Sequence, residues 1–350
     1  MTAGEHASRK RDHLALALGG DVGFATTTTG LERWRLRARA LPEADLDDVD
    51  LSGSLWGRPV AAPLLLSCMT GGTGEAGPVN RALGTAAQHH GLAVGLGSGR
   101  VLLADPQRRE GFDVRAVAPD VPLLANLGAV QLAEVGVDGC AALVEACAAD
   151  ALVLHLNAVQ EALQVGGDTA FGGLAERIAE TAAALSVPVV VKEVGFGLAP
   201  EDVDLLLDAG VAGIDVAGAG GTNWARLEGR RDAWAGAVAA AFADWGWPTA
   251  AAVAHARAAL DRRGEVDVVL IASGGITDGV DVAKALCLGA DLAGVARGVL
   301  AAAAEGPQAA IDAVGVVLEQ LRVAAWAAGA TRPADLDASR LEAVGPPEAR

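Results

Sequence analysis

The sequence predicts a (β/α)8 barrel of the TIM-barrel class, an α/β fold, with an N-terminal extension before it. Eight short apolar runs lie along the 350-residue chain, and Ala-rich helical stretches separate them. The runs are continuously apolar instead of alternating, which is typical of parallel strands that are buried on both faces. Eight strand–helix repeats favour a closed barrel, and a doubly wound open sheet is the alternative.

The predicted strands extend from residue 64 to residue 296. They comprise Leu64–Ser67, Leu92–Gly97, Pro122–Asn126, Ala151–Leu156, Pro188–Glu193, Gly213–Val216, Asp267–Ala272 and Asp291–Ala296. The predicted helices comprise Pro78–His90, Gly139–Ala149, Phe171–Leu185, Glu201–Ala209, Thr249–Arg263 and Gly279–Leu288. Barrels of this class carry their active sites where strands end, so the residues that follow each strand are the functional candidates.

Three segments lie outside the repeat. Residues 1–58 precede the first strand, and within them Arg33–Ala40 alternates arginine with other residues, as a strand with one basic face does. Residues 217–247 form an insertion rich in Gly and Trp after the sixth strand. The third segment starts at Gly306, and we expect one long helix in it, followed by a Pro-rich end. We expect one barrel domain over residues 59–330, with residues 1–58 as a basic N-terminal extension and residues 331–350 as a C-terminal tail.

Composition limits the classes of partner. Hydrophobic residues make up 52% and charged residues 20% of the chain, which favours a large folded core over disorder. The net charge of −17 disfavours nucleic acid and anionic membranes as partners. We expect a cytoplasmic protein, because no apolar run approaches the about 20 residues of a membrane span and the polar N-terminus lacks a signal core. The four cysteines show neither CxxC nor zinc spacing, so reduced thiols are expected.

Two basic clusters interrupt this acidic background. The first is formed by Arg9, Lys10 and Arg11, and the second by arginines that alternate along Arg33–Ala40. Basic clusters on an acidic protein are consistent with a small anionic ligand. They are equally consistent with a solvated tail and with one face of a surface strand.

Glycine turns follow the last two strands. Ser273-Gly274-Gly275-Ile276 follows the seventh strand, and Ala296-Arg297-Gly298 follows the eighth. Backbone N–H groups of such turns, together with a helix N-terminus, bind phosphate in many barrels, and glycine lets the ligand approach the backbone. Tight turns without a ligand are the alternative, but the two turns together favour a phosphate site.

Charged and polar side chains also follow the middle strands. Lys192 ends an otherwise apolar strand, so it either pairs with an acid or acts on a bound group. His155, Asn157, Gln160 and Glu161 gather after the fourth strand. A carboxylate among neutral polar groups suits Mg²⁺, which prefers oxygen ligands, and a buried capping network is the alternative.

These residues fall within longer motifs. The motifs are Arg9-Lys10-x-x-His13, Ala40-Leu41-Pro42-Glu43, Met69-Thr70-Gly71-Gly72, Gly97-Ser98-x-Arg100, His155-Leu156-Asn157-x-x-Gln160-Glu161, Lys192-Glu193-x-Gly195-x-Gly197, Asp215-x-x-Gly218-x-Gly220-Gly221-Thr222-x-Trp224 and Ser273-Gly274-Gly275-Ile276-x-x-Gly279. In them the chain resembles, almost from end to end, the type 2 isopentenyl-diphosphate Δ-isomerases, which are FMN-dependent barrel enzymes. The Gln-Glu and Gly-Gly-Thr-x-Trp segments are the most specific.

The resemblance implies site residues and cofactors. FMN contacts are expected from Cys68, Met69, Thr70, Ser98, Asn126, Lys192, Thr222, Gly274, Gly275, Ala296 and Arg297. Substrate contacts are expected from Arg9, Lys10, His13, Ser98, Arg100, His155 and Gln160, with Gln160 and His155 as catalytic residues and Glu161 as the Mg²⁺ ligand. Members of the family use NAD(P)H to reduce FMN and form homo-oligomers, often tetramers or larger.

The implied reaction converts isopentenyl diphosphate into dimethylallyl diphosphate by acid–base proton transfer with reduced FMN. Reduced flavin would protonate the terminal methylene, and the flavin or Gln160 would take the C2 proton. A weak base suffices for that second step, because a carbocation is a strong acid.

Some positions depart from the family pattern, and other functions stay open. Gly99 replaces a usual Gln, Val165 and Gly166 replace Pro and Glu, and Cys68 stands where Ala or Pro is usual. A longer prenyl substrate, isomerised or cyclised by the same flavin chemistry, would fit this loss of bulk, as would neutral drift.

Two further alternatives are an FMN-dependent oxidoreductase of the 2-hydroxy-acid-oxidase kind and a non-catalytic FMN-binding barrel. Such oxidases carry a His–Arg pair after the sixth strand, where this chain has Val216-Ala217-Gly218-Ala219-Gly220. His255 and Arg257 instead lie on a predicted helix before the seventh strand. Simple flavin storage would need neither Gln160 nor Glu161.

Overall fold

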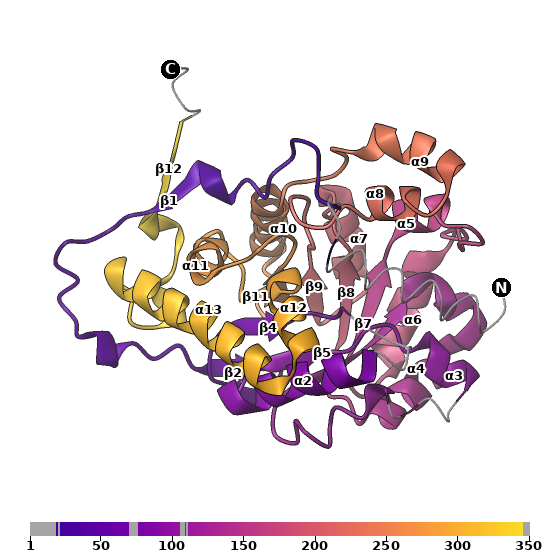
Figure 1. The fold of residues 1–350 in the computed structure, drawn as a ribbon, viewed down its shortest axis with the longest axis horizontal. Helices are drawn as coiled ribbons and strands as arrows, with labels where there is room; N and C mark the ends of the chain where they lie inside the picture. The colour runs from indigo at the N-terminus through magenta and orange to yellow at the C-terminus, as the bar shows by residue number, and fades with distance from the viewer. Residues whose placement is uncertain (1–18, 20–21, 70–75, 106–108, 110, 346–350) are drawn as a thin grey trace.

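The computed structural model describes residues 19, 22–69, 76–105, 109 and 111–345. Its centre is a barrel of parallel strands with helices around it (Figure 1). The barrel is closed and has eight strands in the order β10-β11-β4-β5-β6-β7-β8-β9. The strands are β4 (Leu64–Leu66), β5 (Ala93–Gly95), β6 (Leu123–Gly128), β7 (Ala151–Leu156), β8 (Val189–Glu193), β9 (Gly213–Asp215), β10 (Val269–Ala272) and β11 (Leu292–Val295). The predicted (β/α)8 barrel is therefore confirmed, and the open sheet is wrong.

Helices follow the strands around the barrel. All six predicted helical segments are present, as α2 (Ala76–His90), α4 (Leu132–Cys147), α6 (Leu174–Ala184), α7 (Pro200–Asp208), α10 (Thr249–Arg263) and α11 (Gly279–Cys287). The long helix expected after Gly306 is also present, as α13 (Pro307–Ala327). The structure adds α3 (Arg100–Ala104), α5 (Ala158–Leu163), α8 (Trp224–Gly229), α9 (Ala233–Ala239) and α12 (Arg297–Glu305). Short 3-10 turns connect several of them, at Leu31–Arg33, Leu46–Asp48, Ala129–Gln131, Ala240–Phe242, Pro333–Asp335 and Ala338–Arg340. Within the described part of the chain, no helix is both long and apolar enough to cross a membrane.

The alternating arginines of the extension lie on a surface strand. Strand β1 (Trp34–Leu36) lies beside β12 (Leu341–Ala343) in Figure 1 and pairs with it antiparallel. Arg35 therefore lies opposite Glu342. Arg33, Arg35, Arg37 and Arg39 are all exposed, whereas Trp34 and Leu36 pack against the main core. For this cluster the structure favours the surface-strand interpretation over an anion site.

A hairpin closes the amino end of the barrel. Strands β2 (Gly53–Leu55) and β3 (Arg58–Val60) are joined by Trp56 and Gly57, both of which have positive φ (48° and 80°), as in the turns that two-residue hairpins favour. The last residue of β2, Leu55, and the last of β3, Val60, are buried in the apolar cluster inside the barrel. This end of the barrel is therefore filled with side chains.

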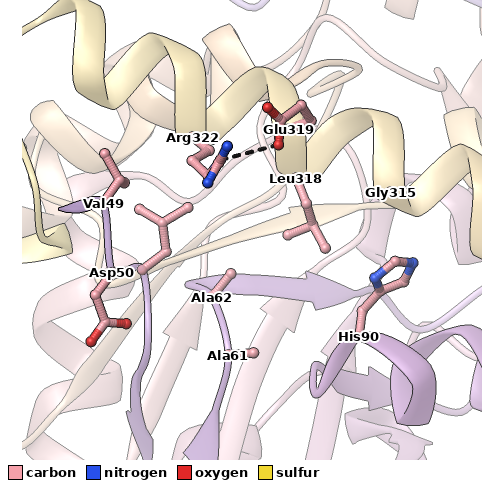
Figure 2. Close-up of a pocket in the computed structure, with 10 residues that line it drawn as sticks. Val49, Asp50, Ala61, Ala62, His90, Gly315, Leu318, Glu319 and Arg322 are labelled. Carbon is pink, nitrogen blue, oxygen red and sulfur yellow. Dashed lines mark hydrogen bonds and ion pairs between the residues drawn. The ribbon is translucent and has the colours of Figure 1, made fainter. Parts of the chain in front are cut away.

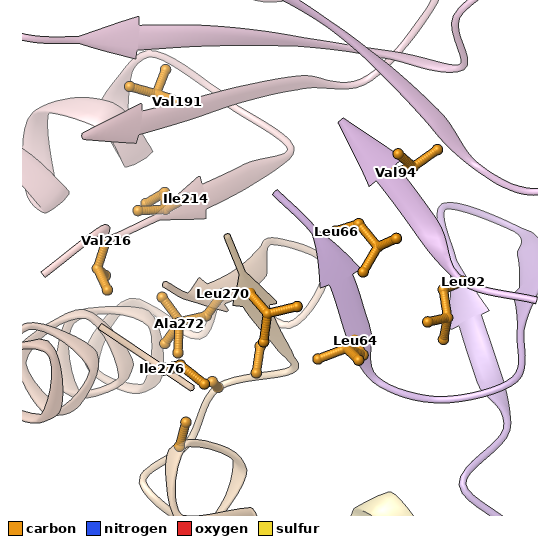
Figure 3. Close-up of a cluster of buried hydrophobic side chains, with 14 of the residues drawn as sticks. Leu64, Leu66, Leu92, Val94, Val191, Ile214, Val216, Leu270, Ala272 and Ile276 are labelled. Atoms are coloured by element: carbon orange, nitrogen blue, oxygen red, sulfur yellow. The ribbon is translucent and has the colours of Figure 1, made fainter. Parts of the chain in front are cut away.

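The barrel strands have two apolar faces. Outward side chains such as Leu64 and Leu66 of β4 and Ile214 of β9 belong to the large core beneath the helices (Figure 3). Inward side chains form a second cluster that contains one residue from nearly every strand: Leu65, Ala93, Leu124, Val153, Val190, Ile271 and Leu292. Both faces are buried, which explains why the strands appear as continuous apolar runs in the sequence.

Candidate active site

A layer of polar side chains lies inside the barrel above the inner apolar cluster. Side chains two residues apart on a strand share a face, so each residue two positions after the inner apolar residue also points inward. Five of these positions are polar, namely Ser67, Asn126, His155, Lys192 and Ser273, and Asp215 holds the same place on β9, two positions after Gly213. The other two are Gly95 and Gly294. We call the six side chains the polar layer, and it lies at the carboxyl ends of the strands.

An ion pair lies at the centre of the polar layer. Lys192 Nζ lies 3.4 Å from Asp215 Oδ2 and donates to Glu193 O at 2.8 Å and to Ser273 Oγ at 3.3 Å. Ser273 Oγ in turn donates to Asp215 Oδ1 at 2.6 Å. The sequence left open whether Lys192 pairs with an acid or acts on a ligand, and the structure shows that it has an acidic partner.

A second polar contact orients His155. Its Nδ1 lies 2.8 Å from Asn126 Oδ1, which can only accept a hydrogen bond, so Nδ1 carries a proton. Ser67 Oγ is buried and has no hydrogen-bond partner among the residues that the structure describes. A buried hydroxyl without a partner is costly, which fits a bound group that completes the layer.

The glycine turns after β9 and β10 fit a phosphate site. Gly274 and Gly275 have φ of 99° and 72°, and a Cβ on Gly274 would lie 2.1 Å from Gly218 O. A Cβ on Gly221 would lie 2.6 Å from Gly275 N, so the two loops meet backbone to backbone. Only glycine allows this approach, and it leaves main-chain groups where side chains would otherwise stand.

Helix α12 supplies the second half of the phosphate site. Its N-cap residue is Ala296, and no side chain caps its first turn, whereas Asp278 caps α11 by accepting from Asp281 N. The N–H groups at a helix start attract anions when no side chain takes them. Arg297, the first residue of α12, is exposed at this point. These residues fit the phosphate of FMN.

A network of buried amides and carboxylates follows β7. Gln160 is 8% exposed, donates from Nε2 to Glu228 Oε1 at 3.1 Å and accepts at Oε1 from Asn157 Nδ2 at 3.2 Å. Glu228 on α8 is only 2% exposed and also contacts Arg231 Nη1 at 3.2 Å. Both ends of the Gln160 amide are therefore held, which fixes the direction of its oxygen.

Glu161 is fixed as firmly as Gln160. Its Oε1 accepts from Asn157 Nδ2 at 2.9 Å, and its Oε2 accepts from Asp168 N at 2.7 Å and Gln164 Nε2 at 3.1 Å. Asn157 Oδ1 is buried beside it without a hydrogen-bond partner in the described chain. A carboxylate next to an unpaired amide oxygen provides the hard oxygen ligands that Mg²⁺ prefers. The described residues contain no group of three or more His, Cys, Asp or Glu that could hold a metal, so most ligands would come from substrate and water.

Two further ionisable groups lie near the polar layer. Burial raises the pKa of the Cys68 thiol to about 11, so it is protonated at neutral pH and is a poor nucleophile. Burial also raises the pKa of Glu193 to about 7, although hydrogen bonds from the backbone N–H of Phe196 and Gly195, both at 2.5 Å, oppose that shift.

The remaining predicted site residues are placed as follows. Cys68 and Met69 follow β4, Ser98 follows β5 and Thr222 lies in the loop after β9, all partly exposed at the carboxyl end. Arg100 begins α3, and in this structure its guanidinium pairs with the exposed Glu134 at 3.1 Å. Arg9, Lys10, His13 and Thr70 lie outside the described residues.

Sequence reasoning overlooked Glu228 and did not identify Asp215 as the partner of Lys192. Glu228 lies in the insertion after β9 and is an acidic residue in the buried face of a short helix, which is a weak signal in sequence. Asp215 was noted within a motif, but its role depends on the register that places it opposite Lys192.

A separate pocket lies at the other end of the barrel. It has a volume of about 390 Å³ and is lined by residues that include Asp50, Ala62, His90, Glu319 and Arg322 (Figure 2). Ala62 and His90 precede β4 and β5, so the pocket lies on the amino side of these strands. Arg322 pairs there with Glu319 at 3.2 Å, and His90 Nε2 contacts Ile311 O at 2.9 Å. It is distinct from the polar layer.

Comparison with known proteins identifies close relatives. The family profile of FMN-dependent dehydrogenases matches residues 134–343. An isopentenyl-diphosphate delta-isomerase of Cronobacter sakazakii is 49% identical over 98% of this chain and 99% of its own length. The enzymes so named from Xanthobacter autotrophicus (50% identical, 95% of both chains) and Mycobacterium marinum (43% identical, 93% and 94%) are similarly related.

Solved structures share the fold. A flavocytochrome b2 variant with sulfite bound superposes with a TM-score of 0.70 at 19% identity, covering 96% of this chain and 86% of that one. A mandelate oxidase variant with benzaldehyde gives 0.67 at 23% identity, covering 97% and 96%. At these identities the likeness concerns the barrel alone.

Proposed function

The chain belongs to the isopentenyl-diphosphate delta-isomerase family, with the barrel of the FMN-dependent dehydrogenases, and we propose that it converts isopentenyl diphosphate into dimethylallyl diphosphate. The observation that supports this proposal is that the glycine turns and the uncapped start of α12 lie at the same end of the barrel as the fixed Gln160–Glu161 network. FMN, once reduced, supplies an electron-rich ring that exchanges protons and favours positive charge nearby.

The phosphate and ring of FMN would be held by residues from several strands. Gly274, Gly275, Ala296 and Arg297 would bind the phosphate, because they form the glycine turns and the start of α12. Lys192 and Asn126 on β8 and β6, with Ser98, Thr222, Cys68 and Met69 after other strands, would surround the ring, because all of them lie toward the carboxyl end of the barrel. The family resemblance adds Thr70 to this set.

Gln160 would orient the reacting alkene and accept the proton lost from C2. Its amide is locked between Asn157 and Glu228, so little conformational entropy is lost when substrate binds. A neutral amide oxygen is a weak base, but the proton of a tertiary carbocation is acidic enough that position decides the rate. His155, oriented by Asn126, would provide a second protonatable nitrogen near the substrate.

Glu161 would hold Mg²⁺ bound to the substrate diphosphate. The metal would take one carboxylate oxygen and the diphosphate oxygens, and it would keep waters in its remaining positions. Arg9, Lys10 and His13 of the N-terminal extension, with Arg100, would add positive charge around the diphosphate. We further propose that NAD(P)H reduces the flavin and that the protein is a cytoplasmic homo-oligomer of four or more subunits.

The decisive experiment is NMR of the products formed from isopentenyl diphosphate by the reduced holoenzyme in D2O with Mg²⁺. We expect dimethylallyl diphosphate with deuterium at C2 and C4. Absence of both conversion and exchange would contradict the proposal. The same assay with longer prenyl diphosphates tests the alternative substrate class, which the substitutions at Gly99, Val165 and Gly166 motivated.

The structure gives no support to a 2-hydroxy-acid oxidase. Val216–Gly220 offers no base after β9, and His255 and Arg257 lie on α10. Arg257 is engaged there with Gly289 O at 2.9 Å and with Asp291 at 3.1 Å. Neither side chain is available to a substrate at the polar layer.

A further inference from the structure

The polar layer contains a buried ion pair whose two members lie on adjacent strands. Lys192 of β8 is the register partner of Asp215 of β9, and their side chains are 11% and 2% exposed. Burying two charges costs free energy unless good geometry and additional hydrogen bonds compensate. Asp215 Oδ1 receives those bonds from Ser273 Oγ at 2.6 Å and Ala217 N at 3.2 Å. The carboxylate is therefore anchored from two directions.

Asp215, and not the sequence neighbour Glu193, is the counter-ion of Lys192. The side chain of Glu193 turns back to the backbone N–H groups of Gly195 and Phe196. Among the described residues, Asp215 supplies the carboxylate within 4 Å of Lys192 Nζ. An ammonium has three donors. Two of them meet Glu193 O and Ser273 Oγ, whereas Asp215 Oδ2 forms an ion pair with Nζ at 3.4 Å without a hydrogen bond. The pair as a whole carries no net charge.

The neutrality of this pair matters for both flavin and substrate. A cation beside the flavin favours its electron-rich reduced form. Protonation of the alkene, however, places positive charge on the substrate in the same dry barrel mouth, where a second cation repels it strongly. A lysine with a buried carboxylate partner can donate hydrogen bonds to a ligand without adding a full positive charge.

We propose that Asp215 is a positioning residue that limits the positive potential which Lys192 exerts at the flavin, so that a cationic substrate state is tolerated there. This inference deepens the proposed function and rests on it. The proposed role of Asp215 predicts opposite effects on flavin reduction and on isomerisation. Loss of the Asp215 charge makes the flavin easier to reduce and at the same time makes isomerisation slower.

The test compares Asp215→Asn with wild-type holoenzyme. The amide oxygen can still accept from Ser273 Oγ and Ala217 N, while an uncharged NH2 group replaces the oxygen that faces Lys192. We expect the equilibrium between oxidised and reduced flavin, measured against a reference dye by flavin absorbance, to shift at least tenfold toward reduced flavin. For a two-electron couple, tenfold is about 30 mV. Isomerase kcat, assayed with fully reduced enzyme, should fall at least tenfold. Ser273→Ala, which removes a neutral bond to the same carboxylate, should shift the flavin equilibrium less than threefold.

The double variant Lys192→Gln with Asp215→Asn keeps the inference testable if the single variant fails to fold. It leaves no unpaired buried charge and has the same net charge as the wild-type pair. Its flavin potential should lie close to the wild-type value, whereas Lys192→Gln alone should make the flavin harder to reduce. A potential unchanged in Asp215→Asn, or a double variant that matches Lys192→Gln, would overturn the role of Asp215.

Failure of the proposed function would look different. The potential measurements need bound FMN and no substrate, so they stand even if isopentenyl diphosphate is not turned over. Wild-type protein that takes up no FMN would contradict the cofactor assignment itself. If Asp215→Asn raises the flavin potential without lowering isomerase kcat, Asp215 does not help the site to tolerate a cationic substrate. The isomerase assignment would remain intact.

Discussion

Replacing Glu193 by Gln should remove a pH-dependent part of the protein's stability. The carboxyl is 8% exposed, and burial raises its pKa from an ordinary 4.5 to about 7. Below pH 4.5 the carboxyl is protonated in both folded and unfolded chains. Between pH 4.5 and 7 the unfolded chain releases the proton while the folded chain retains it, so the free energy of unfolding falls as pH rises.

The size of this effect follows from the shift in pKa. The difference between 4.5 and about 7 is 2.5 units, and at 1.36 kcal/mol per unit the full effect is about 3 kcal/mol. Most of it develops between pH 5 and pH 8. The Gln side chain retains an oxygen that can accept from Gly195 N and Phe196 N, so the loop after β8 keeps its anchor.

Equilibrium urea unfolding at several pH values tests this prediction. We expect Glu193→Gln to gain stability relative to wild type as pH rises from 5 to 8. Glu145→Gln, on the exposed face of α4, is the matched control and should follow the wild-type curve. If the curves of wild type and Glu193→Gln run parallel across this range, Glu193 is not a buried acid with a raised pKa.

Three other variants test the site. Glu161→Gln should abolish the response of turnover to Mg²⁺ while the ratio of bound FMN to protein stays unchanged, and a normal Mg²⁺ titration would remove Glu161 from the metal site. Glu228→Gln should lower kcat by about 10- to 100-fold with little change in KM, since a charge-assisted bond to Gln160 contributes about 1.5–3 kcal/mol; wild-type kcat would refute this. Gly275→Ala places a Cβ 2.5 Å from Thr29 at a φ of 72°, which should weaken FMN binding at least tenfold in fluorescence titrations, and undiminished affinity would exclude this turn from the cradle.

The strands could be predicted because both of their faces are buried. A run such as Val189–Glu193 is apolar at nearly every position, and its length is too short for a buried helix. The helices α3, α5, α8 and α9 were missed because they have only 5 to 7 residues, which is too few to display a 3.6-residue period. The pairing of β1 with β12 was missed because it joins residues about 300 positions apart.

The side chains of the site were easier to predict than their contacts. Lys192, Gln160 and Glu161 follow strands, and that position alone marked them as candidates. The sequence could not say which acid pairs with Lys192, because the answer depends on the strand register that places Asp215 opposite it. Nor could it link Gln160 to Glu228, which lies 68 residues away on a helix that was not predicted.

The hairpin of β2 and β3 determines at which end of the barrel ligands can enter and leave. Leu55 and Val60 pack among the inner apolar side chains, so the amino end of the barrel is closed to ligands. Under the proposed function, FMN and the prenyl diphosphate would therefore enter and leave at the opposite end, where the carboxyl ends of the strands lie. A prenyl substrate bound there would cover the flavin and slow its release.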